Sequence, residues 1–339
     1  MKDLTIMDCT LRDGANVIGN GFTAELTKMI IEGLISSNIR IIEMGNSLGI
    51  GSYEANNSIA PLTDVEYLEL IQPYLSDAKI GMFMGVKNAN RENINLAAKY
   101  NLKFLRIGAN AGDGKKACEG IKFVKQCGMK CYYSIMKAYA LSVDGILEEV
   151  KMLAECGLDQ ITIMDSAGTM MPGQVKEYIL NMVKDIDIPI GFHGHNNLGL
   201  SLANTLVAAE SGATFLDSGL LGMGRSAGNC ATEVAVAVFQ RIGKLQDVDF
   251  YKLLDFIDRE VTPAMNEYGY KAPISSLDLV LGSAGCHSSF TKKFDLIARE
   301  KNIPLYKLIM EVSKIDKKEP SEELIYNIAD QIKLNMRKS

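Results

Sequence analysis

The sequence predicts an α/β protein built as a (β/α)8 barrel with a C-terminal helical annex. Short apolar runs rich in β-branched residues recur at intervals of roughly 20 to 40 residues, and stretches with helical periodicity separate them. The strand-like run comes first in each unit, and the unit occurs eight times before Lys244. Strands that are apolar on both faces and alternate with helices favour a parallel sheet, and eight units favour a closed barrel over an open sheet.

The predicted elements follow one another in a regular order. The expected strands are Leu4–Cys9, Arg40–Met44, Ile80–Met84, Phe104–Ile107, Cys131–Ile135, Gln160–Met164, Ile188–Phe192 and Phe215–Asp217. The expected helices are Glu25–Ser36, Glu66–Leu75, Arg91–Lys99, Ala117–Cys127, Val143–Cys156, Pro172–Val183, Leu198–Ser211 and Ala231–Ile242. Gly128, Gly157 and Gly212 each lie between a helix and the next strand, where a left-handed helix cap favours glycine. Pro189 begins its strand, where a missing N–H is tolerated.

The pattern changes after Lys244 to helices without intervening strands, interrupted by Pro263, Pro273, Pro304 and Pro320. A barrel alone takes about 250 residues, so a chain of 339 residues has room for one barrel and a small second domain. We expect the barrel to span residues 1–260 and a helical C-terminal domain to span 261–339. Such a helical element suits self-association, so we expect a homo-oligomer.

Composition excludes several classes of protein. Lys and Arg number 36 against 41 Asp and Glu, which gives a net charge of −5 and argues against binding nucleic acid or a membrane surface. No apolar stretch approaches the roughly 20 residues of a bilayer span, and the opening segment 3–13 is strand-like rather than a signal peptide. The seven cysteines are odd in number and scattered, which suits reduced thiols. We therefore expect a cytoplasmic protein.

Two of the three histidines lie at the end of the seventh predicted strand, in the segment GFHGHNN at 191–197. Residues two apart in a strand point to the same face, so His193 and His195 project together. Two imidazoles on one face can chelate a divalent cation. The alternative is a pair of hydrogen-bonded core histidines, and a carboxylate near them would favour the metal.

Asp13 supplies such a carboxylate, because it lies just beyond the first strand. In a closed barrel only the eighth strand separates the first from the seventh, so Asp13 can face the two histidines across the mouth. Two imidazoles and one carboxylate suit Mn²⁺ or Mg²⁺, and the amide oxygen of Asn229 can add a fourth ligand. The alternatives are a turn role for Asp13 beside Gly14, and a simple turn or phosphate cradle for the glycine-rich loop 222–229.

Three motifs carry a resemblance to a known family. The segments DCTLRDG at 8–14, HGHNN at 193–197 and GMGRSAGN at 222–229 resemble signatures of the metal-dependent TIM-barrel lyases and synthases. That group includes 3-hydroxy-3-methylglutaryl-CoA lyase, isopropylmalate synthase and 4-hydroxy-2-oxovalerate aldolase. The likeness is strongest to the aldolases and covers nearly the whole chain, including LGSAGCHSSF at 281–290.

The resemblance implies an aldolase that works on a pyruvate enolate, and it assigns roles to particular residues. The implied metal ligands are Asp13, His193 and His195. Arg12 is implied to hold and polarise the 2-oxo acid, since a guanidinium offers a permanent charge and directional donors. Glu43 corresponds to an acidic residue of the wider group and is expected at the substrate site as a partner of Arg12, with an acid catalyst as the alternative. Ser166 corresponds to a serine near the substrate, with a helix or turn cap as the alternative.

The chain also departs from the aldolase pattern. The aldolases have a histidine two residues after the DG pair, where it deprotonates the substrate's 4-hydroxyl. Here Asn16 takes that place and cannot accept a proton near neutral pH. A tyrosine of the annex is replaced by His287, which we expect to have taken over proton transfer. The alternative is a histidine hydrogen-bonded between barrel and annex. The polar Asn16, Asn46 and Arg225 favour an aldehyde larger or more polar than acetaldehyde.

We therefore predict a class II type aldolase that uses Mn²⁺ or Mg²⁺ and takes a 2-oxo acid and an aldehyde. The resemblance also implies an acylating aldehyde dehydrogenase as a partner. One alternative is an acyl-CoA-dependent Claisen-type synthase or lyase, although the glycine-rich loop lacks the cysteine of the hydroxymethylglutaryl lyases. Another is a binding subunit without catalysis, because the expected base is missing.

Overall fold

The computed structural model describes residues 3–55, 59–273, 275–286, 290–316 and 319–336. Eight parallel strands close into a barrel in chain order, because β1 pairs with both β2 and β8. The strands are β1 (Thr5–Asp8), β2 (Ile41–Met44), β3 (Lys79–Gly85), β4 (Phe104–Asn110), β5 (Lys130–Met136), β6 (Gln160–Asp165), β7 (Ile190–Gly194) and β8 (Phe215–Ser218). The predicted (β/α)8 fold is confirmed, with a longer β4 than expected.

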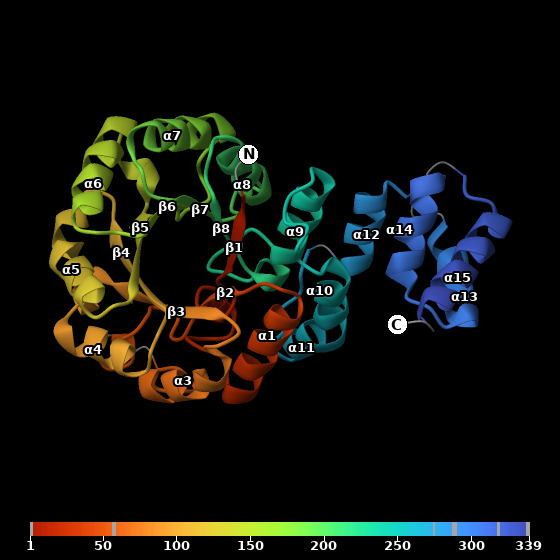
Figure 1. Ribbon diagram of the computed structural model, residues 1–339, viewed down its shortest axis with the longest axis horizontal. Coiled ribbons are helices and arrows are strands. Elements are labelled where there is room, and N and C mark those ends of the chain that lie inside the picture. The colour runs from red at the N-terminus through yellow and green to blue at the C-terminus, as the bar shows by residue number, and fades with distance from the viewer. Residues whose placement is uncertain (1–2, 56–58, 274, 287–289, 317–318, 337–339) are drawn as a thin grey trace.

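Helices surround the barrel and follow the strands in turn (Figure 1). They are α1 (Ala24–Ser36), α3 (Asp64–Leu70), α4 (Arg91–Lys99), α5 (Cys118–Gln126), α6 (Val143–Glu155), α7 (Pro172–Asp185), α8 (Ser201–Glu210) and α9 (Thr232–Arg241), with a short α2 (Ser52–Ala55) after β2. The helix predicted over Glu66–Leu75 instead ends at Leu70 and continues as a 3-10 turn. Pro73 explains this difference, since it lacks an N–H and its ring clashes with the preceding turn. Gly128, Gly157 and Gly212 all have positive φ, as predicted.

The barrel interior is layered. Apolar side chains form one cluster inside the barrel: Met7, Cys9, Ile41, Phe104 and Tyr132, with Phe215 packed against them. The rings of Phe104 and Tyr132 stack with centroids 4.6 Å apart. Side chains two residues further along a strand face the same interior one layer higher. In this sequence that next layer is polar, and it forms the floor of the site described below.

The C-terminal part of the chain is helical among its described residues, as predicted. A continuous run of α10 (Phe250–Phe256), the π-helical turn Ile257–Val261 and α11 (Thr262–Glu267) packs along the barrel. The absent side chain of Gly33 in α1 leaves room for the ring of Phe256, so α1 and α10 pack closely. The domain boundary expected at residue 260 falls within this run, and the division into two domains stays a prediction.

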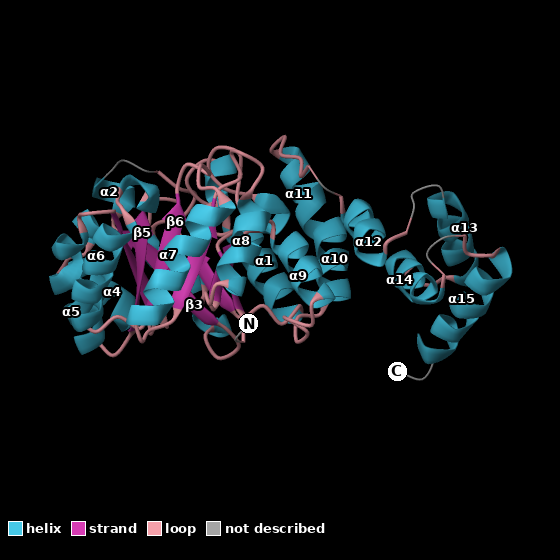
Figure 2. Ribbon diagram, turned by 90° about the horizontal axis from the view of Figure 1, so that it is seen from above, coloured by secondary structure: helices cyan, strands magenta, loops and turns pink. Residues whose placement is uncertain are grey.

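The remaining helices extend away from the barrel (Figures 1 and 2). They are α12 (Ser276–Ala284), α13 (Thr291–Lys301), α14 (Leu305–Ile315) and α15 (Glu322–Met336). Helix α12 contacts both α9 and α14, so it joins the barrel to the outer helices. Across the described part of the chain, none of the helices combines the length and apolar character that crossing a bilayer requires.

Candidate active site

A tight turn after β1 holds two of the predicted site residues at the C-terminal mouth of the barrel. The carbonyl oxygen of Cys9 accepts hydrogen bonds from the backbone N–H groups of Arg12, Asp13 and Gly14, at 2.9 to 3.2 Å. Gly14 lies against the β8 loop, where an added Cβ would come within 3.1 Å of Met223 Cβ. This turn therefore fixes the backbone from which Arg12 and Asp13 extend, and both side chains are buried.

The carboxylate of Asp13 converges with the two imidazoles of the β7 end, as the sequence predicted. Its Oδ2 atom lies 3.8 Å from Nε2 of His193 and 4.0 Å from Nε2 of His195. One ligand atom from each of the three residues lies within 4.8 Å of the other two. The two ring planes meet at 69° with centroids 5.0 Å apart. These separations are too long for direct hydrogen bonds.

The same atoms fit a divalent cation. Such an ion holds nitrogen and oxygen ligands at about 2.1 Å, so one ion can bridge atoms up to about 4.2 Å apart. Among the described residues, Nε2 of His193 and Oδ1 of Asn229 are buried without a hydrogen-bond partner. Buried polar atoms normally have partners, and these two unpartnered atoms are of the kinds that bind a divalent cation.

Asn229 lies beside this group, as expected for a fourth ligand. Its backbone forms an isolated bridge with His195, and its Nδ2 donates a hydrogen bond to Oδ2 of Asp13 at 2.8 Å. The amide oxygen is the atom left free. The glycine-rich loop after β8 thus brings an amide to the two imidazoles and the carboxylate.

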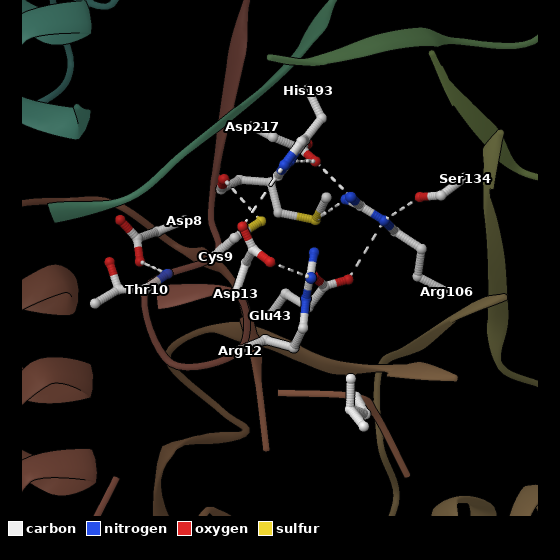
Figure 3. A network of polar contacts seen from close by, with 12 residues as sticks. Asp8, Cys9, Thr10, Arg12, Asp13, Glu43, Arg106, Ser134, His193 and Asp217 are labelled. Carbon is white, nitrogen blue, oxygen red and sulfur yellow. Dashed lines mark hydrogen bonds and ion pairs between the residues drawn. The ribbon is translucent and has the colours of Figure 1, made fainter. Parts of the chain in front are cut away.

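His193 is oriented by Asp217 of β8. Nδ1 of His193 lies 3.1 Å from Oδ2 of Asp217 (Figure 3). A hydrogen bond from Nδ1 to this carboxylate places the proton on Nδ1. The lone pair of Nε2 is then free and faces Asp13. Such carboxylate partners are typical of histidines that ligate metals.

Behind the ligands lies a chain of buried ion pairs (Figure 3). Nε of Arg12 donates to Glu43 at 2.6 Å, and Nη1 of Arg12 contacts Asp13 at 2.9 Å. Arg106 then lies between Glu43, at 3.4 Å, and Asp217, at 2.5 Å. Three carboxylates therefore face two guanidinium groups, and the excess of one negative charge suits a cation at the mouth.

The charges around Asp13 and His195 set their protonation. Burial opposes ionisation of Asp13, but Arg12 and then the two histidines outweigh it, so its pKa lies well below the ordinary value. Burial and the neighbouring His193 lower the pKa of His195 to about 4. At neutral pH Asp13 is thus an anion and His195 a neutral imidazole, which are the forms that bind metal ions.

A second group of candidate ligands is less suitable. Cys9, His193 and Asp217 also bring their ligand atoms within 4.8 Å of one another. However, burial raises the pKa of Cys9 well above its ordinary value, and Asp217 is already engaged by Arg106 and His193. A protonated thiol is a poor ligand, so the set containing Asp13 is the better site.

The other predicted residues surround this centre to different extents. Nδ2 of Asn16 donates to the backbone oxygen of Asp13 at 2.8 Å, so the side chain lies at the metal group. Glu43 is fully buried behind Arg12, which it holds. Oγ of Ser166 accepts a hydrogen bond from the backbone N–H of Lys137, which connects the end of β6 to the loop after β5. Arg225 is exposed on the β8 loop. His287 lies outside the described residues.

Sequence analysis missed Arg106 and Asp217. Each is a charged residue inside an apolar strand, two positions after an aromatic residue of the lower layer, Phe104 and Phe215 respectively. That spacing places the charge on the barrel interior, where it needs a partner. The sequence therefore indicated that each charge is buried. It did not indicate that Arg106 and Asp217 pair with each other, because they are 111 residues apart.

Comparisons with known proteins show the family of this chain. A family model described as HMGL-like matches residues 3–259. The chain is 31% identical to the 4-hydroxy-2-oxovalerate aldolase of Carboxydothermus hydrogenoformans, and the alignment covers 98% of both chains. It is also 31% identical to the protein of the same name in Moorella thermoacetica, with 98% of this chain and 97% of that one covered.

Solved structures show the same architecture. The HMG-CoA lyase of Bacillus subtilis matches with a TM-score of 0.66, covering 83% of this chain and 99% of that chain. The sequence identity of this pair is 17%, so the likeness concerns the fold.

Proposed function

The chain belongs to the HMGL-like family, and on that premise we propose a divalent-metal-dependent aldolase that cleaves or forms a 4-hydroxy-2-oxo acid through a pyruvate enolate. Its relatives named 4-hydroxy-2-oxovalerate aldolase match over nearly the full chain, and the protein is a carbon–carbon lyase of this group. One observation carries the proposal of a metal: Asp13, His193 and His195 bring ligand atoms together at the barrel mouth.

Asp13, His193, His195 and Asn229 would hold the cation, with Mn²⁺ or Mg²⁺ as the ions that this mixture of nitrogen and oxygen ligands suits. A bound cation would act as a Lewis acid that stabilises the negative charge developing on the oxygen of the 2-oxo group. With Asp13 included, the buried ion pairs contain one excess carboxylate, so a divalent cation would leave the site with a net positive charge that attracts an anionic 2-oxo acid.

Arg12 is proposed to bind the 2-oxo acid. Glu43 and Asp13 fix its Nε and Nη1 atoms, and the ring of Phe83 lies 4.9 Å from its guanidinium carbon. Its Nη2 is buried and has no hydrogen-bond partner among the described residues. A guanidinium fixed at two nitrogens keeps the third ready to donate to a carboxylate or enolate oxygen without reorganisation.

Proton transfer at the 4-hydroxyl needs a group other than Asn16, because an amide takes up no proton near neutral pH. We assign this role to His287, because histidine is the side chain whose ordinary pKa lies nearest to neutral pH. The polar Asn16, Asn46 and Arg225 support an aldehyde that is more polar than acetaldehyde. As partners we propose a second copy of the chain and, as the resemblance to the aldolases implies, an acylating aldehyde dehydrogenase that takes up the aldehyde.

The test is a set of incubations of the purified protein with pyruvate and a panel of aldehydes, with Mn²⁺ or with a chelator, read by mass spectrometry. The proposal expects a 4-hydroxy-2-oxo acid that forms only with metal, and exchange of the pyruvate methyl protons in deuterated water. Asp13→Asn should abolish both reactions. A protein that binds Mn²⁺ and pyruvate but catalyses neither reaction would instead be a binding subunit.

A further inference from the structure

The loop that carries Asn229 has little rigidity of its own. It runs from the end of β8 through Gly222, Gly224 and Gly228 to α9, and Gly222 and Gly228 both have positive φ. Glycine leaves the backbone free to adopt many conformations, so the loop must be held by contacts from outside. Asn229 can serve as a ligand only if the loop keeps one shape.

Leu221, at the start of this loop, has a left-handed backbone conformation with φ 57° and ψ 15°. A side chain with a Cβ disfavours that region, and the surrounding structure has to maintain it. Two hydrogen bonds from different elements do so. Oε2 of Glu233 in α9 accepts from the N–H of Leu221 at 3.1 Å, and the hydroxyl of Tyr270 donates to its carbonyl oxygen at 2.9 Å.

Hydrogen bonds connect the two residues after Leu221 to Asn229. The N–H of Asn229 donates to the carbonyl oxygen of Gly222 at 2.9 Å, and its Nδ2 donates to that of Met223 at 3.0 Å. Gly222 and Met223 directly follow Leu221. On the loop side, Asn229 is therefore held by the two residues that follow Leu221, in addition to its contacts with Asp13 and His195.

A cavity of about 220 Å³ borders the loop and is lined among others by Leu221, Asn229, Glu233 and Tyr270. A cavity provides no dispersion contacts to the atoms that line it. The hydrogen bonds of Glu233 and Tyr270 thus replace the packing that would otherwise keep the loop in place.

We infer that Glu233 and Tyr270 are positioning residues for the metal ligand Asn229, and that the segment after α11 thereby controls the affinity of the metal site. Tyr270 lies between α11 and α12, outside the barrel strands and their helices. The inference rests on the proposed function, because it assigns Asn229 to the cation.

Tyr270→Phe tests the inference, because it removes only the hydroxyl. We expect the dissociation constant of Mn²⁺, measured by calorimetry, to rise about tenfold, as for other groups that orient a ligand. Deuterium exchange of the peptide containing residues 221–229 should rise in the metal-free variant. Tyr268→Phe is the matched control, since Tyr268 is 47% exposed and two residues away, and it should change neither quantity.

Variants at Glu233 separate positioning from charge. Glu233→Gln keeps an oxygen that accepts from Leu221 and should bind Mn²⁺ within about twofold of the wild type, whereas Glu233→Ala should bind about tenfold more weakly. Equal Mn²⁺ affinity and exchange in Tyr270→Phe and wild type would overturn the inference, as would equal losses in the Gln and Ala variants. A wild type that binds no Mn²⁺ would instead refute the proposed metal site, and loop exchange would still test the hydrogen bonds.

Discussion

The Nδ1 atom of His193 and the Oδ2 atom of Asp217 lie 3.1 Å apart, and the same carboxylate oxygen lies 2.5 Å from Nη2 of Arg106. Asp217 therefore connects a metal-binding imidazole to a buried guanidinium. This arrangement fixes which nitrogen of His193 is free, and it pairs the buried guanidinium with a carboxylate.

Asp217→Asn should weaken the metal site and the fold together. The Mn²⁺ dissociation constant should rise by roughly 10- to 100-fold, because a neutral amide holds the imidazole less firmly. The free energy of unfolding should fall by about 3 kcal/mol, because Arg106 loses a buried carboxylate partner. Calorimetry and urea unfolding measure the two effects. Asp185→Asn removes a surface ion pair to Lys151 and should leave both quantities nearly unchanged.

Arg12→Lys should reduce turnover of the 2-oxo acid far more than metal affinity. Lysine keeps the positive charge but cannot contact Glu43, Asp13 and substrate from three fixed nitrogens. We expect kcat/KM for the 4-hydroxy-2-oxo acid to fall roughly 10²- to 10³-fold, while Mn²⁺ binding changes only a few-fold. Arg299→Lys, on an exposed helix face, serves as the control. A kcat/KM near that of the wild type would remove Arg12 from substrate binding.

His287→Asn should separate proton transfer from metal binding. The metal ligands proposed above do not include His287, so the affinity for Mn²⁺ should stay as in the wild type. Aldol cleavage should fall by roughly 10²- to 10⁴-fold, which is the usual contribution of a general acid or base. Steady-state kinetics and calorimetry on the same preparation check both. Unchanged turnover would show that another group moves the proton.

Glu233→Gln should stabilise the protein at alkaline pH. Burial raises the pKa of Glu233 from its ordinary 4.5 to about 7. The folded state therefore retains this proton when the unfolded chain has already released it, and the associated stability is complete below pH 4.5 and lost as pH rises to about 7. The loss amounts to about 3 kcal/mol.

The glutamine variant has no proton to lose at this position. Its free energy of unfolding should therefore exceed that of the wild type by about 3 kcal/mol more at pH 8 than at pH 4. Urea unfolding at the two pH values measures this difference. A constant difference between the proteins across that range would contradict the raised pKa.

Gly81→Ala should destabilise the barrel. An added Cβ would come 2.4 Å from Cδ2 of Phe104, whose ring is confined by its stacking on Tyr132. Overpacking of this kind costs roughly 1 to 3 kcal/mol, measurable by urea unfolding. Gly173→Ala in α7 meets no neighbour within 4 Å and should stabilise the protein by about 0.5 kcal/mol. Equal stability of Gly81→Ala and wild type would show that the ring can shift.

Local sequence patterns were sufficient to predict the barrel. Apolar runs of strand length and amphipathic stretches of helical length each depend on neighbouring residues, so their alternation could be read directly. The residues at strand ends were predictable for a related reason, because the barrel topology brings every strand's C-terminal end to one mouth. Asp13, His193 and His195 were placed together in this way. Pro73 in the sequence also indicates where the helix α3 after β2 ends.

Contacts between distant segments could not be predicted from the chain alone. The pairing of Arg106 with Asp217 depends on which interior layer each strand presents, and the barrel's register determines that. The hydrogen bond from Tyr270 to Leu221 depends on how the segment after α11 returns to the barrel. Local periodicity reports the burial and direction of a side chain, whereas its partner is set by packing between segments far apart in the chain.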